Sequence, residues 1–216
     1  MSNKLVWLFD LDNTLHNADI GIFQIINNHM TEYLSSHLSL SWDKASKLRK
    51  KYWDKYGATI AGLRIHHPHI SIDDFLRFSH PEDLVNQSLV VDINLHKTLS
   101  KINGTRVVFS NGPSFYARNI LRQLSIDGLF SYVFGCDDFD YFYKPNIYAY
   151  QFVCKNIDSL PEQCVMVDDS LANLFMAKNL GMQTILFGAN EQKHQFVDYV
   201  VSDWANLFEV SKNFVQ

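Results

Sequence analysis

The feature that most constrains this chain is an apolar run, Val6-Trp7-Leu8-Phe9, that ends in the acidic turn Asp10-Leu11-Asp12. An uninterrupted run of this kind is typical of a parallel strand that is covered on both faces. Ligands of open α/β sheets bind beyond the carboxyl ends of the strands, and both acids fall there. The alternative is that the two aspartates only close a turn through their own hydrogen bonds.

The rest of the chain predicts an α/β fold. Strands are expected at 5–10, 106–110, 132–135, 164–167, 184–187 and 199–201. From position 95 onward they alternate with helical segments, which is typical of right-handed βαβ crossovers. We therefore predict a Rossmann-like, three-layer core built on a parallel sheet.

Residues 16–92 show helical periodicity and no strand alternation. We interpret them as a helical cap domain inserted after the first strand, with the catalytic core formed by 1–15 and 93–216. Cap helices are expected at 19–37, from Ser41 to Gly57, from Thr59 and from Ser71, where Phe75, Leu76 and Phe78 should turn inward. In the core, Ser114 is expected to cap one helix and Pro145 to open another.

Composition excludes several classes of partner. The formal net charge is −4, which gives no basic surface for nucleic acid. Cys136, Cys154 and Cys164 are odd in number and lack metal-ligand spacing, which favours a reducing compartment. No apolar run approaches the ~20 residues that span a bilayer, and the first residues lack a signal-peptide pattern. We expect a soluble, cytoplasmic monomer or homodimer that binds neither nucleic acid nor membrane.

Two later apolar runs also end in polar residues. Val107-Val108-Phe109 precedes Ser110-Asn111-Gly112, and Val165-Met166-Val167 precedes Asp168-Asp169-Ser170; Tyr143-Lys144-Pro145 lies between them. Together with the first acidic turn, and in this order, these motifs resemble the haloacid dehalogenase superfamily of aspartate-nucleophile phosphohydrolases. The resemblance spans about positions 5 to 187.

The resemblance implies a role for each motif. Asp10 would be the nucleophile that forms an aspartyl-phosphate, and Asp12 the general acid and then the general base. Ser110 would hold phosphate oxygens, and Lys144 would offset the repulsion between Asp10 and the phosphate as a point charge. Asn111 would contact phosphate or Asp10, or serve only the turn.

Adjacent acids at the end of a strand repel each other unless a cation is present, which favours Mg²⁺ as the cofactor. The expected ligands are Asp10, Asp168 and the main-chain carbonyl of Asp12. Asp169 would bond to metal-bound waters or to Lys144, or would cap the helix that begins at Ser170. Superfamily members that break carbon–halogen bonds lack the second aspartate, so Asp12 favours phosphate chemistry.

The resemblance sharpens towards the pyrimidine 5′-nucleotidase subfamily, which removes phosphate from UMP, CMP and related monophosphates. It rests on the start Asp10-Leu11-Asp12-Asn13-Thr14-Leu15, on residues 55–64 and on Cys136-Asp137-Asp138 ahead of Lys144-Pro145. The implied partner is a nucleoside monophosphate. Candidate cap residues for its binding are Tyr52, Tyr56, Thr59, Leu63 and His66; the alternative is that this aromatic stripe packs inside the cap.

Two other functions stay open at this stage. The same chemistry could serve another small ester, such as a sugar phosphate, a lysophospholipid or a coenzyme phosphate. A catalytically inactive ligand-binding protein is the other alternative, although Asp10, Asp12, Ser110, Lys144 and Asp168 are all present.

Overall fold

The computed structural model describes residues 5–90, 92–188 and 194–214. Within these ranges a six-stranded sheet runs in the order β3-β2-β1-β4-β5-β6, and its neighbouring strands are all parallel. The strands are β1 (Val6–Phe9), β2 (Thr105–Phe109), β3 (Tyr132–Phe134), β4 (Cys164–Asp168), β5 (Gln183–Phe187) and β6 (Tyr199–Val201). The predicted parallel α/β core, with a helical insertion after the first strand, is confirmed.

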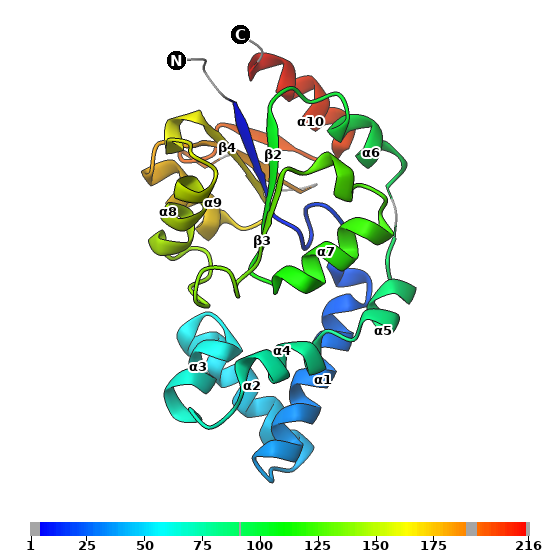
Figure 1. Ribbon diagram of the computed structural model, residues 1–216, viewed down its shortest axis with the longest axis vertical. Coiled ribbons are helices and arrows are strands. Elements are labelled where there is room, and N and C mark those ends of the chain that lie inside the picture. The colour runs from blue at the N-terminus through cyan, green and yellow to red at the C-terminus, as the bar shows by residue number, and fades with distance from the viewer. Residues whose placement is uncertain (1–4, 91, 189–193, 215–216) are drawn as a thin grey trace. The chain divides into compact units, whose positions relative to one another are not determined.

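Helices cover both faces of this sheet (Figure 1). On one face lie α6 (Ile93–Leu99), α7 (Ser114–Gln123) and α10 (Trp204–Ser211), and on the other α8 (Ile147–Asn156) and α9 (Leu171–Asn179). The ring of Phe9 packs 6.1 Å from that of Trp204 in α10, whereas Phe109 packs 5.1 Å from Tyr150 in α8. This double covering explains why every residue of β1 and β4 is buried.

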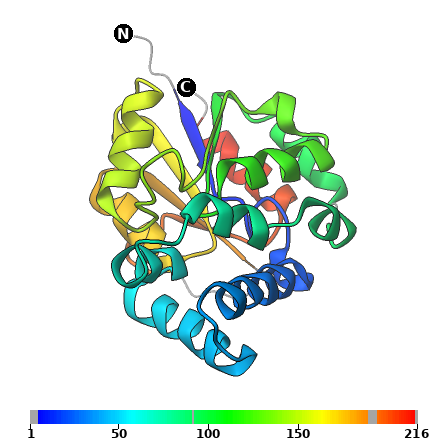
Figure 2. The ribbon, with the colours of Figure 1, turned by 60° about the horizontal axis from the view of Figure 1, so that its bottom comes forward.

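The chain divides into two compact units, residues 1–17 with 90–216 and residues 18–89. The second unit is helical and contains α1 (Ile22–His37), α2 (Trp42–Tyr56), α3 (Thr59–His66), α4 (Ile72–Ser79) and α5 (Glu82–Gln87) (Figure 2). Short 3₁₀ turns lie at Ala18–Ile20 in this unit and at Asp127–Leu129, Pro161–Gln163 and Lys212–Phe214 in the sheet unit. No helix among the described residues has the length and apolar character needed to cross a membrane.

The predicted ends of the cap helices are largely confirmed. Gly57 ends α2 in the left-handed conformation (φ 82°) that glycine adopts without steric cost. Ser71 accepts a hydrogen bond from the Asp74 N–H and so caps α4. The sequence did not predict the short helix α5, which follows Pro81 directly.

The prediction that Phe78 turns inward is wrong. Phe75 and Leu76 are buried, but Phe78 is 42% exposed. Two residues along a helix amount to about 200° of rotation, so Phe78 points away from the side that Leu76 occupies. Its ring instead lies at the surface, beside His29 and Tyr33 of α1.

Two helix starts in the core also differ from the prediction. Ser114 is the first helical residue of α7 rather than its cap, and both its N–H and its hydroxyl donate to Asp137 at 2.6 Å. Pro145 does not open α8, which begins at Ile147 after Asn146 accepts a hydrogen bond from the N–H of Tyr148. Asp137 comes from the loop after β3, and Asn146 directly precedes α8; each satisfies a free N–H group in the first turn of its helix.

Candidate active site

The register of the sheet brings the first aspartate beside the last acidic motif. Phe9 lies level with Val167 of β4, so Asp10 leaves β1 next to Asp168, the last residue of β4. The Asp10 N–H donates to the Val167 carbonyl at 2.9 Å and extends the pairing by one residue. Both carboxylates are almost fully buried. The sequence alone placed them at one edge of the sheet, and the register makes them neighbours.

Lys144 joins these two carboxylates. Its Nζ lies 2.7 Å from Asp10 Oδ1 and 2.7 Å from Asp168 Oδ2, and its side chain is buried. Burial acts to lower the pKa of Lys144, but the two carboxylates outweigh it and raise that pKa above its ordinary value. Lys144 is therefore a fixed positive charge at the centre of the site.

Asp169 completes an acidic cluster with these residues. Side-chain oxygens of Asp10, Asp168 and Asp169 lie within 4.8 Å of one another. Burial and the charge of Asp168 raise the pKa of Asp169 to about 6. Burial also raises the pKa of Asp10, although Lys144 opposes that rise. With all three acids ionised, Lys144 leaves two negative charges uncompensated, and a divalent cation with hard oxygen ligands fits that donor set.

The loop after β4 is built around Asp168. The Asn173 amide donates to both of its oxygens, at 3.0 and 3.1 Å, and the Ser170 N–H donates to Oδ1 at 2.8 Å. Asn173 is buried at the start of α9. Charge-assisted hydrogen bonds of this kind fix the orientation of a carboxylate.

Ser110 and Asn111 follow β2, on the other side of β1. Ser110 is buried and its hydroxyl oxygen accepts the Gly112 N–H at 2.9 Å. The Asn111 side chain bonds the main chain of Lys144 at both ends: its amide donates to the carbonyl at 2.9 Å, and its oxygen accepts the N–H at 2.7 Å. These bonds position Lys144, which is a role that the sequence did not predict for Asn111.

Sequence reasoning missed two residues of the site. The Tyr116 hydroxyl donates a hydrogen bond to Asp12 Oδ1 at 2.6 Å, and His16 Nε2 lies 3.1 Å from the same oxygen. Burial, together with Asp12, raises the pKa of Tyr116 well above its ordinary value, so its hydroxyl keeps its proton. The spacing of His16, four residues after Asp12, was the available signal, whereas Tyr116 lies 104 residues away in sequence.

The predicted cap residues fall into two groups. Tyr52 and Leu63 are buried, and the ring of Tyr52 lies so close to Gly62 that a Cβ there would overlap it. The hydroxyl of Thr59, also buried, donates to the Arg49 carbonyl at 3.4 Å. Tyr52, Thr59 and Leu63 therefore pack inside the helical unit, as the alternative interpretation of the aromatic stripe predicted. Tyr52 and Thr59 both contact residues of that unit.

Tyr56 and His66 form the second group. They are at least partly exposed, and the Tyr56 hydroxyl lies 2.6 Å from His66 Nε2. The Nζ of Lys55 lies 5.0 Å from the centre of the Tyr56 ring. This pair leaves an aromatic and an imidazole group accessible on the helical unit.

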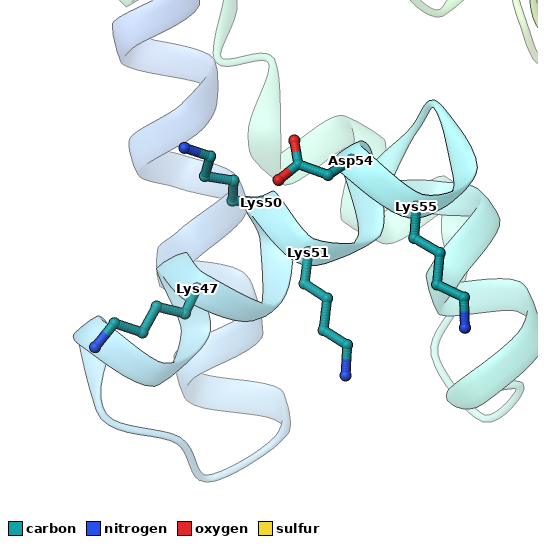
Figure 3. A pocket seen from close by; sticks show the side chains of 5 residues that line it. All are labelled: Lys47, Lys50, Lys51, Asp54 and Lys55. Carbon is teal, nitrogen blue, oxygen red and sulfur yellow. The ribbon is translucent and has the colours of Figure 1, made fainter.

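A separate hollow of about 460 Å³ lies on α2 and is lined by Lys47, Lys50, Lys51, Asp54 and Lys55 (Figure 3). Figure 3 shows these side chains extending from one helix, with Lys51 and Lys55 on one side and Asp54 on another. Lys47 is paired with Asp43 at 2.8 Å in an exposed, i,i+4 ion pair. The hollow has the character of a solvated helix face, so we place the chemistry at the acidic cluster of the core.

Comparison with known proteins agrees with this geometry. The family model described as haloacid dehalogenase-like hydrolase matches residues 6–181. Among curated proteins, the chain is 25% identical to a phosphoglycolate phosphatase of Colwellia psychrerythraea over 88% of either protein. It is also 21% identical to phosphate metabolism protein 8 of Saccharomyces cerevisiae, with 99% of this chain and 71% of that protein covered.

Solved structures share the fold at low sequence identity. An HAD phosphatase from Thermococcus onnurineus superposes with a TM-score of 0.70 at 20% identity, covering 95% of this chain and 97% of the other. The HAD-hydrolase YfnB of Bacillus subtilis, crystallised with magnesium bound, has a TM-score of 0.62 at 14% identity and covers 96% and 98%. These similarities establish the fold, and the chemistry is inferred from the geometry of the site.

Proposed function

Because the chain belongs to the haloacid dehalogenase-like hydrolase family, we propose that it hydrolyses phosphate monoesters through a phosphoaspartate at Asp10. The observation that carries the proposal is the buried contact of Lys144 with both Asp10 and Asp168, at 2.7 Å each. A phosphomonoester dianion repels an attacking carboxylate. A fixed ammonium between them offsets that repulsion without reorganisation during the reaction.

Each step of the proposed hydrolysis can be assigned to a residue of this chain. Asp10 attacks phosphorus, and the bond from phosphorus to the ester oxygen breaks. Asp12 gives its proton to the departing oxygen and later takes one from the water that releases inorganic phosphate. Ser110, at the end of β2, binds phosphate oxygens. Lys144 compensates the negative charge of the transferred phosphoryl group throughout the reaction.

The acidic cluster is the proposed Mg²⁺ site. Asp10, Asp168 and the main-chain carbonyl of Asp12 would be the ligands, with Asp169 bonded to coordinated water. When bound, Mg²⁺ supplies positive charge to the phosphate oxygens and helps to orient the phosphate. Support comes from the charge balance of the cluster and from the magnesium bound in the YfnB structure.

The proposed substrate is a pyrimidine nucleoside monophosphate such as UMP or CMP. The motifs of the turn after β1, of residues 55–64 and of 136–138 support this assignment, and Tyr56 with His66 offers accessible groups for a base. The phosphoglycolate phosphatase among the relatives supports a second candidate, a small phosphate ester without a base.

Initial rates of phosphate release test both levels of the proposal. UMP, CMP, AMP, GMP, phosphoglycolate and several sugar phosphates would be compared with Mg²⁺ and with EDTA. We expect Mg²⁺-dependent release that is fastest with UMP and CMP, and a loss of more than about 10³-fold in Asp10→Asn. Fastest release from phosphoglycolate or the sugar phosphates would discard the nucleotidase assignment alone. No release from any ester would favour a ligand-binding protein.

A further inference from the structure

The proposed general acid is held by two residues that come from different parts of the chain. Tyr116 in α7 and His16 in the turn after β1 both contact Oδ1 of Asp12, at 2.6 and 3.1 Å. Asp12 is only partly exposed, and both partners are buried. An aspartate side chain has two rotatable bonds, and two donors on one oxygen from two directions restrict both of them.

The turn after β1 delivers His16 to this place. The Leu11 carbonyl accepts the N–H groups of Thr14, Leu15 and His16, and Asn13 takes a left-handed conformation with φ 59°. The chain therefore folds back so that the imidazole lies beside the carboxylate four residues earlier. Asp12 Oδ1 accepts in the ionised carboxylate, and it still accepts in the acid form when the proton to be transferred is on Oδ2. The proton of the contact therefore lies on Nε2 of His16 in both forms.

The other ring nitrogen of His16, Nδ1, is buried and has no hydrogen-bond partner among the described residues. A buried imidazole with an unsatisfied nitrogen is unfavourable unless its remaining contact compensates. Within the described ranges, the hydrogen bond that the His16 side chain makes is the one with Asp12.

Contacts around the start of α7 fix the position of Tyr116. It lies in the first turn of α7, whose first residue, Ser114, is held by Asp137 through two hydrogen bonds of 2.6 Å. Its ring passes beside Gly112, where a Cβ would lie only 3.0 Å from a ring carbon. The rings of Tyr116 and His16 also meet edge to face, with centroids 6.5 Å apart. The two residues thus form one support for the carboxylate.

We propose that Tyr116 and His16 are positioning residues that fix Asp12 for proton transfer to the leaving-group oxygen. The inference rests on the proposed phosphatase function and adds two residues to it. A displacement of about 1 Å of a reacting group can cost about 10²-fold in rate. Loss of either support should therefore weaken the proton transfer while leaving attack by Asp10 intact.

Leaving groups of graded basicity separate this role from a structural one. p-Nitrophenyl, phenyl and benzyl phosphate are similar in shape, but nitrophenolate departs without a proton and the benzyl alkoxide needs one. The parameter kcat/KM is the readout, because it covers the steps up to departure of the leaving group and excludes hydrolysis of phosphoaspartate. The variants are Tyr116→Phe and His16→Leu, with Asp12→Ala as the reference for complete loss.

We expect Tyr116→Phe and His16→Leu to lower kcat/KM about 10–10²-fold for benzyl phosphate. For p-nitrophenyl phosphate the change should stay within about threefold, because that step needs no acid. His16→Gln, whose amide can reach the position of Nε2, should restore much of the benzyl activity. Thr98→Val is the control, since it removes a buried 3.0 Å hydrogen bond to the Trp204 carbonyl, away from Asp12.

Equal losses for all three esters, or none, would overturn the inference while leaving the phosphatase function standing. Failure of His16→Gln to recover would overturn the part that concerns His16. If the wild-type protein released phosphate from none of the three esters, the proposed function itself would fail, and this inference with it. Circular dichroism and thermal unfolding identify any variant that has lost its fold, and the folded variant of the other supporting residue then decides.

Discussion

Among single residues, Lys144 contributes most to the charge balance of the site. It is a buried cation that touches two buried carboxylates, whereas Lys178 pairs with Asp198 at 2.7 Å in a partly exposed position. Removing one partner of a buried ion pair leaves an uncompensated charge in the interior, which is far more costly than losing a surface pair.

We therefore expect Lys144→Met to lower the free energy of unfolding by about 3–5 kcal/mol, measured by urea denaturation without Mg²⁺. Lys178→Met should change it by about 0–1 kcal/mol. Added Mg²⁺ should recover part of the loss in Lys144→Met, because a second cation then compensates Asp10 and Asp168. Equal effects of the two substitutions would contradict the assignment of Lys144 as the central charge.

The raised pKa of Asp169 gives a prediction in pH. Below its pKa of about 6, Asp169 holds a proton, and above it a negative charge joins the cluster. Mg²⁺ must displace that proton at low pH, so affinity for Mg²⁺ should rise as pH rises between about 5 and 7, by up to about tenfold per unit. Isothermal titration calorimetry measures it. Asp169→Asn should flatten the curve, and Asp127→Asn, at an exposed position, should not.

At the level of elements, the contact between the end of β3 and the start of α7 sets the position of Tyr116. A Cβ on Gly135 would overlap the main-chain nitrogen of Ser114, and the Cys136 N–H donates to the Gly112 carbonyl at 3.0 Å. We expect Gly135→Ala to cost about 1–3 kcal/mol of unfolding free energy. Gly128→Ala, with nothing within 4 Å of its added Cβ, should change it by less than about 0.5 kcal/mol. Urea denaturation of both variants decides, and a stable Gly135→Ala protein would refute this packing argument.

The elements were largely predictable from the sequence, because their signals are local. The apolar runs that became β1 and β4, the glycine at position 57 and the serine at position 71 each act within a few residues. The contacts of Tyr116 with Asp12 and of Asn111 with Lys144 join residues 104 and 33 positions apart, which no periodicity encodes. Short helices such as α5 and start positions such as that of α8 depend on loop hydrogen bonds, and were missed or shifted for that reason.

At the scale of the whole molecule, the proposed chemistry lies within one compact unit. Asp10, Asp12, Ser110, Lys144 and Asp168 all belong to residues 1–17 and 90–216. The helical unit of 18–89 contributes none of them, and its accessible pair of Tyr56 and His66 is proposed only for substrate choice. Substitutions in that pair should therefore change KM between esters more than they change the rate with p-nitrophenyl phosphate.

The measurement that tests the central claim most directly is chemical trapping of the intermediate. The protein would be mixed with p-nitrophenyl phosphate and Mg²⁺, quenched rapidly and treated with borohydride, which reduces an acyl phosphate of aspartate to homoserine. Mass spectrometry should find homoserine at position 10, more of it in Asp12→Asn because phosphoaspartate hydrolysis is slowed, and none in Asp10→Asn. Phosphate release with homoserine absent from position 10, or present at position 168 instead, would contradict the account.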